Sequence, residues 1–172
     1  MIVIVFGLPG SGKSYFASRF AKMINAGYVN SDKLRKEMFT ERVYSDKEKK
    51  VVYDTMLEQM KKAVQQNNNL VLDGTFHKKD TRKLFVEEIQ MLGEDEILFI
   101  EVWADEEIIR ERVKKARPYS EADFKVYQFI NQHNEPLDEP HLVLQSTNDN
   151  LNEMLQRASE YLKIKNDDRT NQ

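Results

Sequence analysis

The strongest chemical motif in this sequence is GLPGSGKS, residues 7–14, which directly follows the apolar run Ile2–Phe6. It matches the P-loop pattern G-x-x-x-x-G-K-[ST], in which glycines allow successive backbone N–H groups to surround a phosphate. The apolar run before it and the helical spacing after it supply the strand–loop–helix context that the pattern requires. We therefore predict that the loop binds the phosphate tail of a nucleotide. The residues expected to contact the nucleotide are Gly7, Pro9, Gly10, Ser11, Gly12, Lys13 and Ser14.

Three side chains are candidates for contact with the phosphate charge and with a metal ion. Lys13 would place a positive charge on the β- and γ-phosphates, and the Ser14 hydroxyl would ligate Mg²⁺. Asp73 lies near the end of the apolar stretch LVLDG, where a carboxylate opposite a P-loop is expected to order Mg²⁺ or its water ligands. A structural carboxylate satisfied by backbone donors is the alternative for Asp73. The predicted cofactors are ATP and Mg²⁺.

The acceptor side of a phosphoryl transfer is predicted in the stretch SDKLR, which follows the second expected strand. Asp32 could accept the proton of an attacking hydroxyl, and Arg35, three residues later on the same helix face, could hold an anionic group. The alternative is that Ser31 or Asp32 caps the helix while Arg35 is solvated. Thr75 and Arg82, beyond Asp73, either lie near the acceptor or serve as cap and surface residues.

Arginines after the fourth expected strand, in RERVKKARPYSEAD, form a candidate lid. An arginine closing over the phosphates would stabilise charge on the γ-phosphoryl oxygens and exclude water, and Arg112 and Arg117 are the candidates. Arg110 is expected to stack on adenine, and Thr147 and Asn148 are expected to line the adenine pocket. A solvated basic face paired with nearby glutamates is the alternative for these arginines.

Apolar runs alternate with helical spacings along the chain, which predicts an α/β fold: a doubly wound, five-stranded parallel sheet with a helical lid. Residues 1–164 are expected to form a single P-loop kinase domain, and residues 165–172 a disordered tail. The expected strands are 2–6, 26–30, 70–74, 96–104 and 141–146. The expected helices after the one that follows the P-loop are 31–39, 46–66, 78–92, 105–115, 121–133 and 151–162.

Composition limits the class of protein. The net charge of -3 over 172 residues argues against a protein that coats nucleic acid by bulk electrostatics. The absence of cysteine excludes disulfides and thiolate metal sites. No apolar run is long enough to span a bilayer, and the N-terminus lacks the features of a signal peptide. A cytoplasmic location is therefore expected, without a membrane partner.

The ordered set of motifs GLPGSGKS, SDKLRKEMF, VLDGTF, VWADEEIIRERVKKAR and EPHLVL resembles the compact P-loop kinases of the polynucleotide 5′-hydroxyl kinase type, a group of AAA-like ATPases. The resemblance extends from Ile2 to about Leu162. It implies transfer of the γ-phosphate of ATP to a hydroxyl, with Mg²⁺. It also implies that Asp32 is the general base, that Arg35 binds the acceptor's phosphate, and that Arg112 or Arg117 acts at the transition state.

The resemblance leaves several acceptors open. A polynucleotide 5′-hydroxyl or a nucleotide-like molecule is the acceptor that it implies first. Small-metabolite kinases of the gluconate or shikimate type and the zeta-toxin sugar-nucleotide kinases share the scaffold, and the repair modules often joined to polynucleotide kinases are absent here. A nucleotide-binding switch that hydrolyses ATP without an acceptor is a further alternative.

Overall fold

One parallel sheet forms the centre of the protein in the computed structural model, which describes residues 1–93, 97–116 and 119–170. The sheet has five strands in the order β2-β3-β1-β4-β5, so the predicted doubly wound α/β fold is confirmed. Since β1 is central, all its residues are buried. The strands are β1 (Ile2–Phe6), β2 (Gly27–Asn30), β3 (Leu70–Gly74), β4 (Ile97–Trp103) and β5 (Leu142–Gln145).

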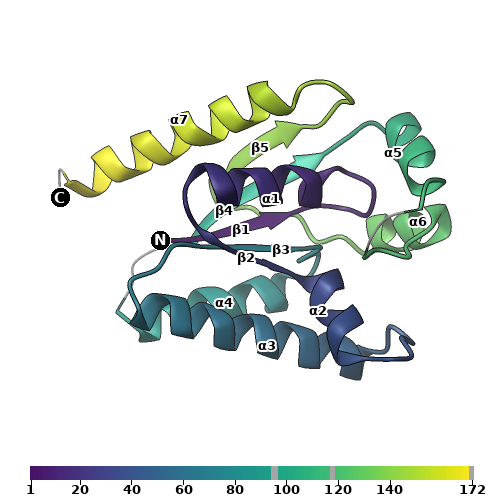
Figure 1. The fold of residues 1–172 in the computed structure, drawn as a ribbon, viewed down its shortest axis with the longest axis horizontal. Helices are drawn as coiled ribbons and strands as arrows, with labels where there is room; N and C mark the ends of the chain where they lie inside the picture. Colours follow the sequence, from purple (N-terminus) through teal and green to yellow (C-terminus); the bar gives the residue numbers. More distant parts are fainter. Residues whose placement is uncertain (94–96, 117–118, 171–172) are drawn as a thin grey trace.

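Helices cover both faces of the sheet (Figure 1). The face with α1 (Lys13–Met23) and α7 (Leu151–Thr170) lies opposite the face with α3 (Asp46–Gln65) and α4 (Lys79–Met91). The three shorter helices lie beyond the carboxyl ends of the strands, on the right of Figure 1. These are α2 (Ser31–Met38), α5 (Glu106–Val113) and α6 (Phe124–Gln132).

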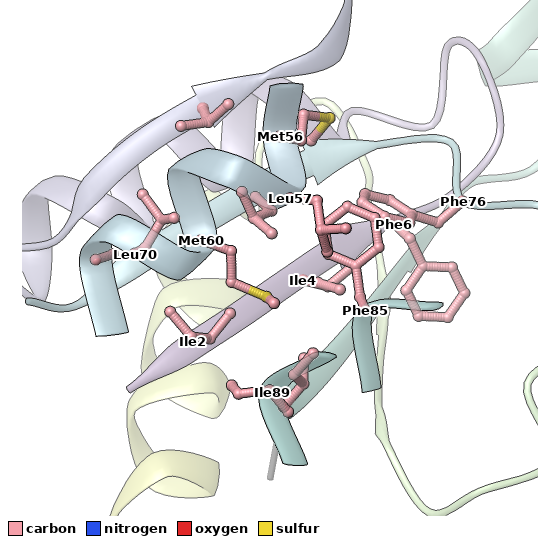
Figure 2. Close-up of a cluster of buried hydrophobic side chains, with 14 of the residues drawn as sticks. Ile2, Ile4, Phe6, Met56, Leu57, Met60, Leu70, Phe76, Phe85 and Ile89 are labelled. Carbon is pink, nitrogen blue, oxygen red and sulfur yellow. The ribbon is translucent and has the colours of Figure 1, made fainter. Parts of the chain in front are cut away.

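The two faces of β1 each belong to a separate apolar core. Side chains alternate across a strand, so Ile2, Ile4 and Phe6 face α3 and α4, while Val3 and Val5 face α1 and α7. Figure 2 shows the first of these cores, in which methionines of α3 and aromatic side chains near α4 cover β1. Burial on both faces holds β1 in place and therefore fixes the loop at its end.

Strand order locates the site. The chain leaves β1 for β2 on one side and reaches β4 on the other, so β1 lies at the topological switch point where α/β sheets bind ligands. The P-loop, α2 and α5 all start from carboxyl ends of strands. Over the residues that the structure describes, each helix is too short or too polar to span a bilayer.

Two helix boundaries differ from the sequence predictions by three residues or more. Helix α7 continues to Thr170, into the segment predicted to be a disordered tail, because residues 165–170 contain neither Gly nor Pro to interrupt a helix. Residues 171–172 of that segment lie outside the described residues. Helix α6 begins only at Phe124, because the Asp123 side chain accepts a hydrogen bond from the Val126 N–H and caps the helix.

Phe85 is expected to be a main contributor to stability. Its side chain is fully buried and makes edge contacts with Phe76 and Tyr53, at centroid distances of 5.3 Å and 6.4 Å. Phe85→Ala should therefore lower the free energy of unfolding by about 3–5 kcal/mol. Leu84→Ala, one residue away and 37% exposed, is the matched control in urea denaturation. Equal losses in the two variants would contradict this account of the core.

Candidate active site

The P-loop has the backbone conformation of a phosphate cradle. Gly10 and Gly12 have φ of +81° and +92°, in the left-handed region that favours glycine. A Cβ on Gly12 would lie 2.5 Å from Ser146 Oγ, and one on Gly7 only 2.1 Å from the Val102 carbonyl oxygen. Neighbouring strands therefore leave no room for side chains here. Helix α1 begins at Lys13, so its N-terminal N–H groups point at the same space.

The Lys13 ammonium and the Asp73 carboxylate lie close enough to interact electrostatically. Lys13 Nζ donates to the Leu8 carbonyl at 3.5 Å, and its charge acts on Asp73, lowering the pKa of that carboxyl. Burial acts more strongly in the other direction, so the pKa of Asp73 is raised overall. A positive charge brought close to Asp73 would oppose this effect of burial.

Asp73 is the centre of a hydrogen-bond network. Its Oδ2 accepts from the Tyr28 hydroxyl at 2.6 Å and from Asn30 Nδ2 at 2.5 Å. The same Asn30 amide group donates to Ser14 Oγ at 3.3 Å. Asn30 thus joins Ser14 and Asp73, the two residues predicted to act at the metal. Burial and the nearby Asp73 carboxylate raise the pKa of Tyr28.

The donor set fits Mg²⁺. Within the described part of the chain, Asp73 Oδ1 is buried without a hydrogen-bond partner, and a hard oxygen in that state suits a divalent cation or its water. No three His, Asp or Glu side chains cluster as a metal site among the described residues. Mg²⁺ held by Ser14 and Asp73 would take its other ligands from phosphate and water, as it commonly does.

Asp32 and Arg35 lie on α2 as the sequence predicted, but Arg35 is buried. The helix cap is Asn30, whose Oδ1 accepts from the Lys33 N–H at 2.7 Å, so the alternative with a Ser31 or Asp32 cap and a solvated Arg35 is wrong. Asp32 lines the cavity described below. Its Oδ1 lies 3.5 Å from an Arg35 nitrogen, which orients the carboxylate.

Arg112 ties two loops together. Its guanidinium donates to the Ser11 carbonyl at 3.1 Å, to the Thr147 carbonyl at 2.6 Å and to Ser146 Oγ at 3.2 Å. These bonds connect the P-loop to the β5–α7 loop, and burial lowers the pKa of Arg112. Arg112 thus forms a clamp between the P-loop and the β5–α7 loop, and its role at the transition state stays a prediction.

Arg110 lies apart from the cavity. Its guanidinium pairs with Glu106 at 3.0 Å and stacks on Phe124 at 3.9 Å. This side of α5 faces α6, because residues four apart share one helix face. The prediction that Arg110 stacks on adenine is therefore not supported by its position. Arg117, the other predicted lid arginine, lies outside the described residues.

A cavity of about 610 Å³ joins the P-loop, Asp32 and the β5–α7 loop. Its size is typical of small-molecule sites. Thr147 and Asn148 line it, and their predicted contact with adenine stays a prediction. Further lining residues that sequence reasoning did not select are Tyr15, Arg19, Tyr28, Asn30, Lys115, Tyr119 and Ser120.

Arg82 has a structural position. Its guanidinium donates to the Phe76 carbonyl at 2.6 Å and to the Glu135 carbonyl at 2.7 Å. The Phe76 N–H donates to the Tyr53 hydroxyl at 3.2 Å, so both polar groups of this residue, whose φ is +44°, are bound. Arg82 is thus neither a surface residue nor turned toward the acceptor; it fixes the chain that follows Thr75.

Comparisons with known proteins identify the family and the fold of this chain. A family model described as "AAA domain" matches residues 2–137, and no curated protein matches the sequence. A sugar kinase from Janibacter sp. HTCC2649 has a similar structure, with TM-score 0.71 and 19% identity, and the match covers 94% of each chain.

Two further kinases have similar structures. For a gluconokinase from Sinorhizobium meliloti, the TM-score is 0.68 at 17% identity, covering 95% of this chain and 96% of that one. For the Mycobacterium tuberculosis APS kinase in complex with AMPPNP and APS, the TM-score is 0.68 at 17% identity, covering 94% and 97%. Since the family model spans most of the sequence, the chain belongs to the AAA domain family, with the α/β fold of P-loop kinases.

Proposed function

We propose that the protein is an ATP- and Mg²⁺-dependent phosphotransferase that moves the γ-phosphate to a hydroxyl of a small metabolite. The observation that carries the proposal is the position of Asp32, a carboxylate that lines the same cavity as Lys13 and Ser14. A switch that only hydrolyses ATP would not need a carboxylate oriented by an ion pair at this place.

The proposed reaction is an in-line displacement. The acceptor oxygen forms a bond to the γ-phosphorus, the bond from the γ-phosphorus to the β–γ bridging oxygen breaks, and the hydroxyl proton passes to Asp32. Lys13 and the N-terminus of α1 stabilise the charge on the phosphoryl oxygens. Mg²⁺ held near Ser14 and Asp73 would neutralise part of the phosphate charge.

A small acceptor has more support than a polynucleotide. The loop 39–45, between α2 and α3, contacts the chain between α5 and α6 through Arg42 and Tyr44, which both bind Glu121. These contacts cross the side of the site where we propose that the acceptor binds. A polynucleotide strand would need an open groove there. The net charge of -3 supports the same acceptor class, as does the structural similarity to a sugar kinase, a gluconokinase and an APS kinase.

Asp32→Asn tests the proposed base. We expect kcat to fall about 10²–10⁴-fold, because the amide cannot accept the hydroxyl proton, while the MgATP-induced rise in melting temperature remains. The assay uses γ-labelled ATP with a panel of sugars, sugar acids, nucleosides and 5′-hydroxyl oligonucleotides. If only the oligonucleotides were labelled, the acceptor would be a polynucleotide end and not a small metabolite. Transfer by the variant at the wild-type rate would refute the mechanism.

Asp73→Asn separates the metal role of this carboxylate from its structural role. An amide oxygen can still accept from Tyr28 and Asn30, so the variant without ligand should melt at or above the wild-type temperature. The folded wild type holds the Asp73 proton more tightly than the unfolded chain does, because burial raises its pKa. The stability of the wild type relative to the variant should therefore fall as pH rises above about 4, the pKa of an aspartate in an unfolded chain.

The same variant should lose most of the melting-temperature rise that MgATP produces, since a ligand bound only by the folded state stabilises it. ATP with EDTA is the control, because contacts of the P-loop with phosphate persist without the metal. A full MgATP response in Asp73→Asn would contradict the metal assignment.

Arg112→Met tests the clamp. Loss of its bonds to the P-loop and the β5–α7 loop should raise the KM for ATP about tenfold, with a smaller change in kcat. Lys114→Met, on an exposed residue at the end of the same helix, is the control in the same steady-state assay. A fall in kcat at unchanged KM would instead indicate a transition-state role for Arg112.

A further inference from the structure

We propose that Arg42 and Tyr44 form a binding site for an anionic group of the acceptor, and that the Glu121 carboxylate occupies this site when the acceptor is absent. The inference rests on the proposed function. It narrows the acceptor to a hydroxyl compound that carries a carboxylate or a phosphate, such as a sugar acid or a sugar phosphate.

The loop 39–45 that carries the site is held in one conformation by Glu48. This buried carboxylate accepts from the Val43 N–H at 2.9 Å and from the Tyr44 N–H at 2.8 Å. Tyr44 has φ of +53°, an uncommon conformation for a bulky residue. Such a conformation persists only where the surroundings enforce it, and it commonly marks a binding site.

Tyr44 links the acceptor base to the proposed anion site. Its ring lies over the Arg35 guanidinium at 4.8 Å, and Arg35 is paired with Asp32. Its hydroxyl donates to Glu121 Oε2 at 3.1 Å. An acceptor with its hydroxyl at Asp32 would therefore reach along Tyr44 to place its charged end where Glu121 now lies.

Arg35 itself is less suited to bind the acceptor's charge directly. Its side chain is 8% exposed and lies between two carboxylates, those of Asp32 at 3.5 Å and Glu48 at 4.0 Å. Its charge is thus already compensated within the protein. Arg35 instead orients Asp32 and supports the Tyr44 ring, which makes it a positioning residue.

Arg42 has the properties of an anion-binding arginine. Its guanidinium forms an ion pair with Glu121, while its Nε is buried and has no hydrogen-bond partner among the described residues. The planar guanidinium of an arginine can bind a carboxylate or a phosphate at two points. The Lys36 ammonium, 5.9 Å from the Tyr119 ring centre, adds positive charge nearby.

Glu121 resembles a bound anion more than a structural residue. It is half exposed, and its two oxygens contact Arg42 and Tyr44. These contacts lower the pKa of Glu121, so the carboxylate is charged at neutral pH. An exposed ion pair contributes little stability, so an incoming carboxylate or phosphate can displace it.

Matched acceptor pairs test the site: glucose with gluconate, ribose with ribose 5-phosphate, and adenosine with AMP, each with γ-labelled ATP. Within a pair that is phosphorylated, we expect the lower KM for the anionic member. Arg42→Gln should raise the KM of that member about tenfold or more, and leave the neutral member unchanged. Glu121→Gln should lower the KM of the anionic member about two- to fivefold. The neutral amide no longer competes with the acceptor for Arg42, and an exposed ion pair is weak.

The control variants are Lys61→Gln and Glu88→Gln, which break an ion pair of 2.9 Å between α3 and α4. Lys61 is about as exposed as Arg42, whereas Glu88 is more buried than Glu121. They should change neither KM. If Glu121 only fastens the two loops, Glu121→Gln would lower kcat for both members of a pair and would not lower the KM. That result would overturn the proposal, as would a neutral acceptor with the lower KM.

A binding measurement separates this inference from the proposed function. Inorganic phosphate is titrated into the protein while the arginine Nε–H signals are followed by NMR. We expect the Arg42 signal to shift, and the half-saturating phosphate concentration to fall about two- to fivefold in Glu121→Gln. Absence of any phosphorylated acceptor would refute the proposed function alone. Absence of an Arg42 shift in both proteins would refute the anion site alone.

Discussion

The buried carboxylate of Asp73 is the constraint on which the site depends. A charge without solvent is costly unless hydrogen bonds satisfy it, and here the donors come from Tyr28 and Asn30 on the neighbouring strand β2. Asn30 also contacts Ser14 and caps α2. One carboxylate therefore fixes the relative positions of the P-loop, β2 and the helix that carries Asp32. The remaining unpaired oxygen gives this network its capacity for a cation.

Guanidinium groups connect the loops at the carboxyl edge of the sheet. Arg112 joins the P-loop to the β5–α7 loop, Arg82 joins the end of β3 to the chain after α6, and Arg35 joins α2 to α3 through Glu48. Backbone carbonyls that loops leave unpaired need donors, and an arginine offers several in one plane. Arg112 and Arg82 order four segments in this way: the P-loop, the β5–α7 loop, the chain after β3 and the chain after α6.

The fold could be predicted from sequence because its signals are local. A P-loop is a contiguous pattern, and a strand buried on both faces is a continuous apolar run, so β1 and the residues that follow it were identified correctly. The position of Asp32 beside the cavity was also predicted from its place after β2, while its role as a base stays a prediction. The extent of α7 was missed because a polar sequence without helix breakers is compatible with both helix and tail.

Side-chain roles that depend on tertiary contacts could not be predicted. Arg110 and Arg112 are two residues apart, and only packing against α6 or the P-loop decides which of them reaches the cavity. The sequence shows Tyr28 only as a strand residue. Its hydrogen bond to Asp73 depends on the pairing of β2 with β3. The clamp formed by Arg112 also has a kinetic consequence. If the proposed function holds, nucleotide binding needs little ordering of the P-loop and the β5–α7 loop, because Arg112 already joins them. An anionic acceptor would instead have to replace the contact of Glu121 with Arg42. The two proposals together therefore predict an ordered sequence in which the nucleotide binds first.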